Sequence, residues 1–399
     1  TWANIALGNW GAPASWTNNT VPNAAGATAI FNAPGAGVSL GVDLTGGPFT
    51  VGTLSLRNPV SGGFNFQGGT LAMNRAGGAS IVVETENFVP DFFAGSALRL
   101  DANTRVNTLN ATSVFNVVGN VSGVGSLQKN GPGVMVMQGV GTYAGGTRVS
   151  GGRLTIAGGS ALADGGSVRV DAAGTLQVDA TETIGVLVNA GTVNVADGQS
   201  LVAPTISNTG AGTINIGVGS TMQGTGNTLN NAAVINVATN GAVTDAGAVN
   251  NLAAGVINFN GPGGTATLSS GTNVITNAGA INVNSGGVNV TGNVRNHTAG
   301  TITLAAGAGT VNVTGNVRNQ DNATITVNGG SLAVTGTLTN VSAAAAGIQV
   351  AAGRTLSAAA ISNAAGATID NSGAVNAQTG NIDNSGTITI TAPLSAINA

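Results

Sequence analysis

The side chains that could perform chemistry are few in this sequence, and they lie far apart. Charged residues make up 6% of the 399 positions, and the 14 acidic residues are scattered along the chain. Three of them, Glu84, Glu86 and Asp91, lie close to the apolar segment FVPDFF. Two neighbouring carboxylates could act as general acid and general base on a glycosidic bond. We favour a solvated loop for this group, and a polysaccharide-degrading enzyme is the alternative.

The single histidine, His297, is the other candidate for catalysis. A hydrolytic triad needs a serine nucleophile, a histidine base and a carboxylate that orients the base. His297 directly follows the repeated Asn296 and is not part of such a motif. Calcium-binding Gly-Gly-x-Gly-x-Asp nonapeptides, a zinc-ligand set and a phosphate-binding loop are absent from the sequence. The sequence therefore predicts a protein that is not an enzyme and that binds no metal or cofactor.

Charge and hydrophobicity narrow the classes of partner. The net charge is −3, and the 11 basic residues form no cluster. Nucleic acid is thus not an expected partner, because binding it requires a concentrated basic surface. No apolar run reaches the roughly 18 residues that a membrane-spanning helix needs. Cysteine is absent, which suits a bacterial protein that is exported.

One nonapeptide, VNVTGNVRN, occurs at 288–296 and again at 311–319. Side chains alternate between the two faces of a strand, so the valines and Asn296 are expected to point inward. Gly292 marks a bend where two strands meet. Arg295 and Arg318 would then stack outward, one above the other, as a candidate docking site for an anionic polysaccharide.

The nonapeptide belongs to a longer repeat that runs from residue 186 to the C-terminus. Each copy has an apolar residue, a variable residue and Asn, followed by a short β run, and successive copies begin 19 to 26 residues apart. Short strands repeated at this period with Gly and Asn between them are typical of a solenoid. Frequent glycines and β-branched residues exclude helical repeats. The prediction is an all-β fold, a right-handed parallel β-helix with about 20–23 residues per rung, where a rung is one circuit of the chain.

The asparagine of each copy is expected to face the interior. A buried amide without hydrogen bonds costs a few kcal/mol, and the same amide in the next rung can supply the missing partner. We therefore interpret the repeated asparagines as a structural ladder. They are Asn189, Asn208, Asn231, Asn251, Asn277, Asn296, Asn319, Asn340, Asn363 and Asn384.

Aromatic residues divide the chain. All three tryptophans and eight of the nine phenylalanines precede residue 144. We expect an aromatic-rich N-terminal β segment or cap at 1–125, a section of different repeats at 126–185, and the regular asparagine-ladder β-helix at 186–399.

The section from 127 to 154, LQKNGPGVMVMQGVGTYAGGTRVSGGRL, resembles the passenger-associated repeat of bacterial autotransporters. That pattern is Leu-x-Lys-x-Gly-x-Gly with alternating apolar residues, then a Gly-x-Asn-x-Tyr-x-Gly turn, Thr-x-Val and Gly-x-Leu. Gly141 stands where the family usually has Asn. The matching residues are Leu127, Lys129, Gly131, Gly133, Met135, Met137, Gly139, Tyr143, Gly145, Thr147, Val149, Gly152 and Leu154.

The resemblance implies β-helix rungs that aid secretion and folding of a passenger. It also implies a protein that is secreted or displayed on the surface of a Gram-negative bacterium, where it acts in adhesion or in a matrix. Export would then use an outer-membrane translocator barrel as partner, although the C-terminal residues continue the repeat instead of showing barrel strands. Polysaccharide of a host or neighbouring cell surface is the expected ligand.

Self-association is a further expectation. The edge strands of a terminal rung can pair with another chain, and low charge removes repulsion between copies. Head-to-tail stacking into filaments would bring such an edge against the aromatic N-terminal segment, where Trp2, Trp10 and Trp16 are the candidate interface. A last alternative is ice binding through the Thr-Ile-Thr triplets that begin at 301, 324 and 387.

Overall fold

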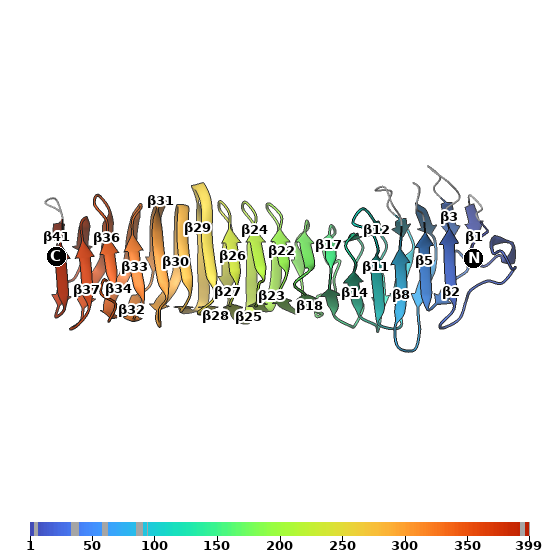
Figure 1. Ribbon diagram of the computed structural model, residues 1–399, viewed down its shortest axis with the longest axis horizontal. Helices are drawn as coiled ribbons and strands as arrows, with labels where there is room; N and C mark the ends of the chain where they lie inside the picture. The colour runs from blue at the N-terminus through green and yellow to red at the C-terminus, as the bar shows by residue number, and fades with distance from the viewer. Residues whose placement is uncertain are drawn as a thin grey trace. The chain divides into compact units, whose positions relative to one another are not determined.

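The computed structural model describes residues 1–3, 7–32, 40–57, 63–84, 91–93, 95–391 and 396–398, with the backbone alone at 91–93, 227, 273 and 396. The chain divides into two compact units, Thr1–Asn194 (unit 1) and Val195–Ala399 (unit 2). Strands of successive rungs lie side by side within each unit, and the strand pairs are parallel (Figure 1). The predicted all-β parallel solenoid is confirmed. None of the described residues form a helix with the length and hydrophobicity needed to cross a membrane.

The described part of unit 1 contains one short 3-10 helix, η1 (Pro13–Ser15), and its other regular elements are strands. These are β1 (Leu7–Asn9), β2 (Thr28–Asn32), β3 (Leu40–Asp43), β4 (Phe49–Val51), β5 (Thr53–Arg57), β6 (Phe64–Gln67), β7 (Thr70–Met73), β8 (Ala79–Val83), β9 (Asp91–Phe93), β10 (Ala97–Leu100), β11 (Thr104–Thr108), β12 (Val114–Val117), β13 (Val121–Gly123), β14 (Leu127–Asn130), β15 (Val134–Met137), β16 (Thr147–Val149), β17 (Gly152–Ile156), β18 (Ser167–Val170), β19 (Gly174–Val178), β20 (Glu182–Thr183) and β21 (Val186–Asn189), followed by β22 (Thr192–Val195), which reaches the division between the units.

Three stacks of parallel strands build unit 1. The first runs through β2, β5, β8, β11, β14, β16, β18 and β21, and the second through β1, β3, β6, β9, β12, β15, β17 and β19. The third, shorter stack contains β4, β7, β10 and β13. Each rung therefore contributes one strand to each face of the solenoid where all three stacks are present.

Unit 2 repeats this plan with strands that range from 3 to 22 residues in length. They are β23 (Ser200–Asn208), β24 (Thr213–Ile216), β25 (Thr221–Asn231), β26 (Val234–Val237), β27 (Ala242–Asp245), β28 (Ala248–Asn251), β29 (Val256–Asn277), β30 (Ala280–Asn296), β31 (Thr301–Thr314), β32 (Val317–Asp321), β33 (Thr324–Val327), β34 (Ser331–Ser342), β35 (Ile348–Val350), β36 (Thr355–Asn363), β37 (Thr368–Asn371), β38 (Ala374–Ala377), β39 (Ile382–Asn384), β40 (Thr387–Ile390) and β41 (Ala396–Asn398).

The two copies of the nonapeptide lie directly on one another in unit 2. Val288 pairs with Val311, and Val294 pairs with Val317 in the same register. Burial alternates along both copies, with valines inside and the residues between them exposed. Gly292 has a φ of 125°, a left-handed conformation that glycine adopts without strain, and it stands between the two straight parts of the nonapeptide. The repeat thus encodes one rung twice.

A tryptophan cluster fills the N-terminal end of unit 1. Trp2, Trp10 and Trp16 pack around Phe31, and none of the three indole rings exposes more than 2% of its residue surface. The Trp16 indole N–H donates to the carbonyl of Trp10 at 2.8 Å, and that of Trp10 donates to the carbonyl of Pro22 at 3.0 Å. This placement corrects the expectation of a tryptophan assembly interface. The same chain already covers the rings, which leaves them no surface for a second copy.

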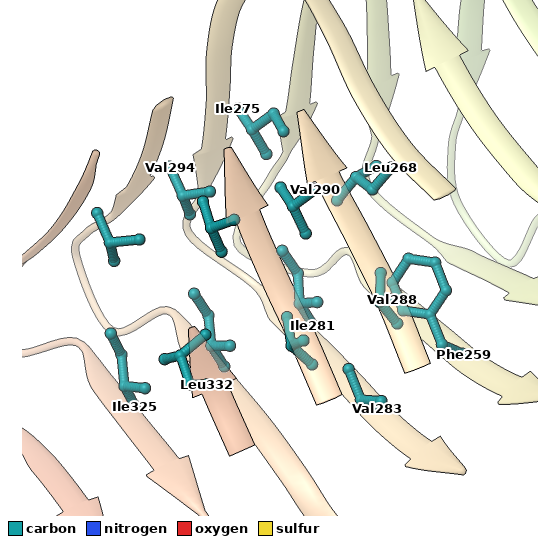
Figure 2. Close-up of a pocket in the computed structure, with 14 residues that line it drawn as sticks. Phe259, Leu268, Ile275, Ile281, Val283, Val288, Val290, Val294, Ile325 and Leu332 are labelled. Atoms are coloured by element: carbon teal, nitrogen blue, oxygen red, sulfur yellow. The ribbon is translucent and has the colours of Figure 1, made fainter. Parts of the chain in front are cut away.

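One small cavity lies inside unit 2. Its volume is about 30 Å³, and apolar side chains from β29 to β34 line it. Figure 2 shows Leu268, Val288 and Val290 around this space. Phe259 is paired with Val283, so an aromatic ring in one rung is followed by a smaller side chain in the next. An apolar space of this size is expected to stay dry.

The variant Val288→Ile adds one methylene group at the wall of this cavity. We expect stability to rise by up to about 0.8 kcal/mol, because the new group is buried without displacing neighbours. The control is Val249→Ile at a fully buried position of β28 that does not line the cavity. There the added atom should cost about 1–3 kcal/mol by overpacking. Urea unfolding midpoints of the three proteins check this, and equal losses in both variants would contradict it.

Candidate functional site

The repeated asparagines of unit 2 form a hydrogen-bonded column inside the solenoid. From Asn208 to Asn363, each Nδ2 donates to the Oδ1 of the asparagine one rung on, at 2.7–3.1 Å. The same Nδ2 atoms also donate to backbone carbonyls, for example Asn296 to Thr324 at 2.9 Å. These eight side chains are at most 1% exposed. The inner ladder, as we call this column, has its donors engaged within the protein and offers no group to a ligand.

The two outermost predicted members differ from the rest. Asn189 belongs to unit 1, where it is fully buried and accepts a hydrogen bond from the backbone N–H of Gly191 at 3.1 Å. Asn384 accepts from Asn363 at 2.8 Å and is exposed.

Replacing Asn296 by Ala removes one member from the middle of the inner ladder. The amide N–H of Asn277 and the amide oxygen of Asn319 would then each lose a buried partner. We expect a loss of about 2–4 kcal/mol, because an unsatisfied buried polar group costs about 1–3 kcal/mol. The matched control is Asn289→Ala, which removes an exposed amide from the same strand and should change stability by less than about 0.5 kcal/mol. Unfolding midpoints measure both, and a similar small effect at Asn296 would show that the ladder is dispensable.

A second column of asparagines lies on the outside of unit 2, and the sequence reasoning above missed it. Asn236 donates to Asn215 at 2.9 Å, Asn258 to Asn236 at 3.0 Å, and Asn282 to Asn258 at 3.0 Å. All four are half-buried. The signal was available, since these residues are the centre of INI, INV, INF and INV in successive repeats. We call Asn215, Asn236, Asn258 and Asn282 the outer amide column, and its chemistry is uncharged hydrogen bonding.

The predicted docking pair is brought together as expected from the repeat. Arg295 and Arg318 are register partners on β30 and β32, and both side chains are exposed. Arg318 donates from Nε to Gln320 Oε1 at 2.9 Å. The nearby Asp321 carboxylate accepts from the backbone N–H of Thr298, which lowers its pKa, and Arg295 lowers it further. The ionised Asp321 carboxylate therefore competes with any external anion for the positive charge of this arginine pair.

The candidate catalytic residues do not assemble a described acid–base site. His297 Nδ1 lies 3.0 Å from Thr298 Oγ1. Glu84 Oε2 lies 3.7 Å from Arg57 Nε, with both side chains about half exposed. Glu86 and the side chain of Asp91 are outside the described residues. Within the described part of the chain, no three His, Asp or Glu residues are grouped so that they could hold a metal ion.

The passenger-type section of unit 1 contains buried polar groups. Lys129 is fully buried, and its Nζ donates to the carbonyls of Asn130, Gly131 and Gly151 at 2.9, 3.0 and 3.1 Å. Burial lowers the pKa of this ammonium group to about 8. The hydroxyl of Tyr143, also buried, lies 2.6 Å from Thr147 Oγ1. Lys129 thus ties its own rung to the backbone of the next at Gly151, and Tyr143 and Thr147 are joined through their side chains.

Glu182 is a buried acid that the motif analysis did not identify. Its carboxylate accepts from the backbone N–H groups of Ala161 at 2.9 Å and Leu162 at 3.2 Å. Desolvation raises the pKa of Glu182 to about 7, and Asp164 adds to this rise, whereas the backbone hydrogen bonds oppose it.

A pH dependence follows from Glu182. Its folded-state pKa lies above the ordinary value of 4.5, so the folded protein holds the proton more tightly than the unfolded chain. Stability should therefore fall by about 1–3 kcal/mol between pH 4.5 and 7 and stay low above pH 7. Glu182→Gln removes the titration, so the difference in unfolding midpoint between wild type and variant should change across this pH window. A constant difference from pH 4.5 to 8 would refute the assignment.

No family model matches this chain, and no curated protein is similar to it. Among solved structures, the chain is similar to the crystal structure of a TibC-catalyzed hyper-glycosylated TibA fragment, with 20% sequence identity and a TM-score of 0.27. The alignment covers 84% of this chain and 99% of that chain. A likeness with this TM-score carries no argument about function.

Proposed function

We propose that this protein is a non-enzymatic β-solenoid passenger that is displayed on, or secreted from, a Gram-negative bacterium and acts in adhesion. The observation that carries the proposal is the outer amide column of unit 2. The inner ladder fixes the rungs, and the outer column then presents amide groups at the spacing of parallel strands, about 4.8 Å. Uncharged donors and acceptors in a regular row suit the hydroxyl groups of a surface polysaccharide.

The passenger-type section supports the same role. Lys129 and Tyr143 match the autotransporter motif and are buried, and Lys129 holds two successive rungs together through its bond to Gly151. An interior that is fixed in this way suits a protein whose task is to present a surface rather than to move around a substrate. We include in this proposal the role in export that the resemblance to the passenger-associated repeat implies.

The alternative of a polysaccharide-degrading enzyme receives less support. Glycosidases place two carboxyl groups within about 5–10 Å of each other across the bond that is cleaved. Of the predicted acidic group, only the side chain of Glu84 is described, and Arg57 is its near neighbour. Ice binding is also disfavoured. In the outward column that continues from Asn282, Thr303 and Thr326 are adjacent, but Gln349 and Asp370 follow them before Thr389.

Adhesion can be tested with the purified chain coupled to beads. We expect beads that carry the wild-type chain to be retained on surfaces coated with neutral or acidic polysaccharide. Retention should fall roughly tenfold in the double variant Asn236→Ala/Asn258→Ala, because it removes the hydrogen bonds of two amides. The matched control, Asn289→Ala/Asn312→Ala, removes two outward amides elsewhere in unit 2. Equal loss in both variants would contradict a role of the outer column. Release of reducing ends from the polysaccharides that disappears in Glu84→Gln would contradict the non-enzymatic assignment.

A further inference from the structure

A polar groove lies on the outside of unit 1, where β8, β11 and β14 begin. These three strands belong to one stack and lie side by side (Figure 1). The groove has a volume of about 420 Å³, which falls within the range of small-ligand sites. It is lined by Arg75, Gly77, Gly78, Ala79, Ser80, Asn103, Thr104, Arg105, Ser126 and Gln128.

Of the described residues that line this groove, two carry guanidinium groups and none carries a carboxylate. Arg75 and Arg105 are exposed, and within the described residues neither has an acidic group within 4.0 Å. Arg75 donates to the hydroxyl of Thr53 at 3.5 Å. Arg105 lies beside the side chain of Asn130, which accepts from its Nε at 3.1 Å when the amide oxygen faces the guanidinium. Among the described residues, both cations thus have only neutral partners, and they retain N–H groups for a ligand.

Arg99, Arg148 and Arg169 of unit 1 differ in this respect. Arg99 is bound by Asp101 in two hydrogen bonds of 2.8 Å. Arg148 and Arg169 continue the outward column that contains Arg105, and Asp171 neutralises both of them at 2.6 and 2.8 Å. In this column, Arg105 lies at the groove and has no carboxylate partner among the described residues, whereas Arg148 and Arg169 share Asp171.

The remaining groups of the groove suit hydroxyl-bearing ligands. Ser80, Arg105 and Gln128 occupy the same position in three successive rungs. Gln128 lines the groove and donates from Nε2 to Ser150 Oγ at 2.9 Å, and that bond leaves its amide oxygen available as an acceptor. Gly77, with a φ of 82°, has no atom within 4 Å of the place where a side chain would begin, so the rim is open there.

We infer that this groove binds an acidic sugar residue, a uronate or a sulfated sugar, as part of a polysaccharide. The carboxylate or sulfate lies between Arg75 and Arg105, because planar guanidinium groups bind such anions through paired N–H groups. The sugar hydroxyls bond to Ser80 and Gln128. The inference rests on the proposed adhesive function for the nature of the partner. Its site lies in unit 1 and the outer amide column lies in unit 2, so the two can fail separately.

The experiment is isothermal titration of the full chain with oligogalacturonate, a sulfated oligosaccharide, a neutral oligosaccharide and inorganic sulfate. We expect binding of at least one acidic oligosaccharide, at least tenfold weaker binding of the neutral one, and a decrease in affinity as salt is raised. Arg75→Gln/Arg105→Gln should lower the affinity at least tenfold, and Arg105→Lys should lie between wild type and that variant. Arg153→Gln, at an exposed position of β17 outside the groove, is the control and should stay within twofold.

Two results would overturn the inference. The first is unchanged affinity in the double arginine variant while its unfolding midpoint matches wild type. The second is equal affinity for inorganic sulfate and the acidic oligosaccharides, which would make the groove a simple anion site. Because Asn236→Ala/Asn258→Ala should leave this titration unaltered, failure of the outer amide column in the bead assay does not affect the outcome.

Discussion

A side-chain amide in a protein interior must find partners for its N–H groups and its oxygen within the protein. Each buried polar group left unpaired costs about 1–3 kcal/mol, which is a large part of the roughly 5–15 kcal/mol by which a domain is stable. From Asn208 to Asn363, each inner-ladder asparagine donates to the next asparagine and to a backbone carbonyl of the following rung, as Asn296 does. This interaction is satisfied only when successive rungs lie in one register. A shift of one residue would bring Arg318 inside and Asn319 outside, since strand side chains alternate.

The fixed register has consequences on the outer face. The asparagines of the outer amide column lie above one another because the inner residues next to them are already aligned, as Asn236 and Asn258 show. The same alignment places Arg295 against Arg318 in unit 2, and the register of β16 and β18 places Arg148 against Arg169 in unit 1. A column of like charges is tolerated where a carboxylate such as Asp171 lies within reach. The outside of such a solenoid is therefore a set of straight columns, each with its own chemistry.

The few buried charges of unit 1 follow a different rule. Lys129 and Glu182 are bound by backbone groups and not by each other in the hydrogen bonds described, so carbonyl dipoles solvate the ammonium group and N–H dipoles solvate the carboxylate. Both groups are costly to bury in charged form, and the pKa values of both move toward neutrality. They hold irregular segments that the regular asparagine ladder does not reach.

The sequence by itself determined the fold class and the faces of the strands. Alternation of apolar and polar residues and a period near twenty are local properties, so they assign Val288, Val294 and Asn296 to the interior before any rung is stacked. The outer asparagines were equally visible in the sequence, at the centre of each INV-type run.

Stacking of the rungs decided the rest. Arg75 and Arg105 share a groove because a rung of 25 residues separates Ser80 from Arg105 in one column. The tryptophans are covered by their own chain, and Glu182 reaches two N–H groups about twenty residues away. Such contacts depend on the length of individual rungs and on the path of the corners, and no local pattern in the sequence encodes either.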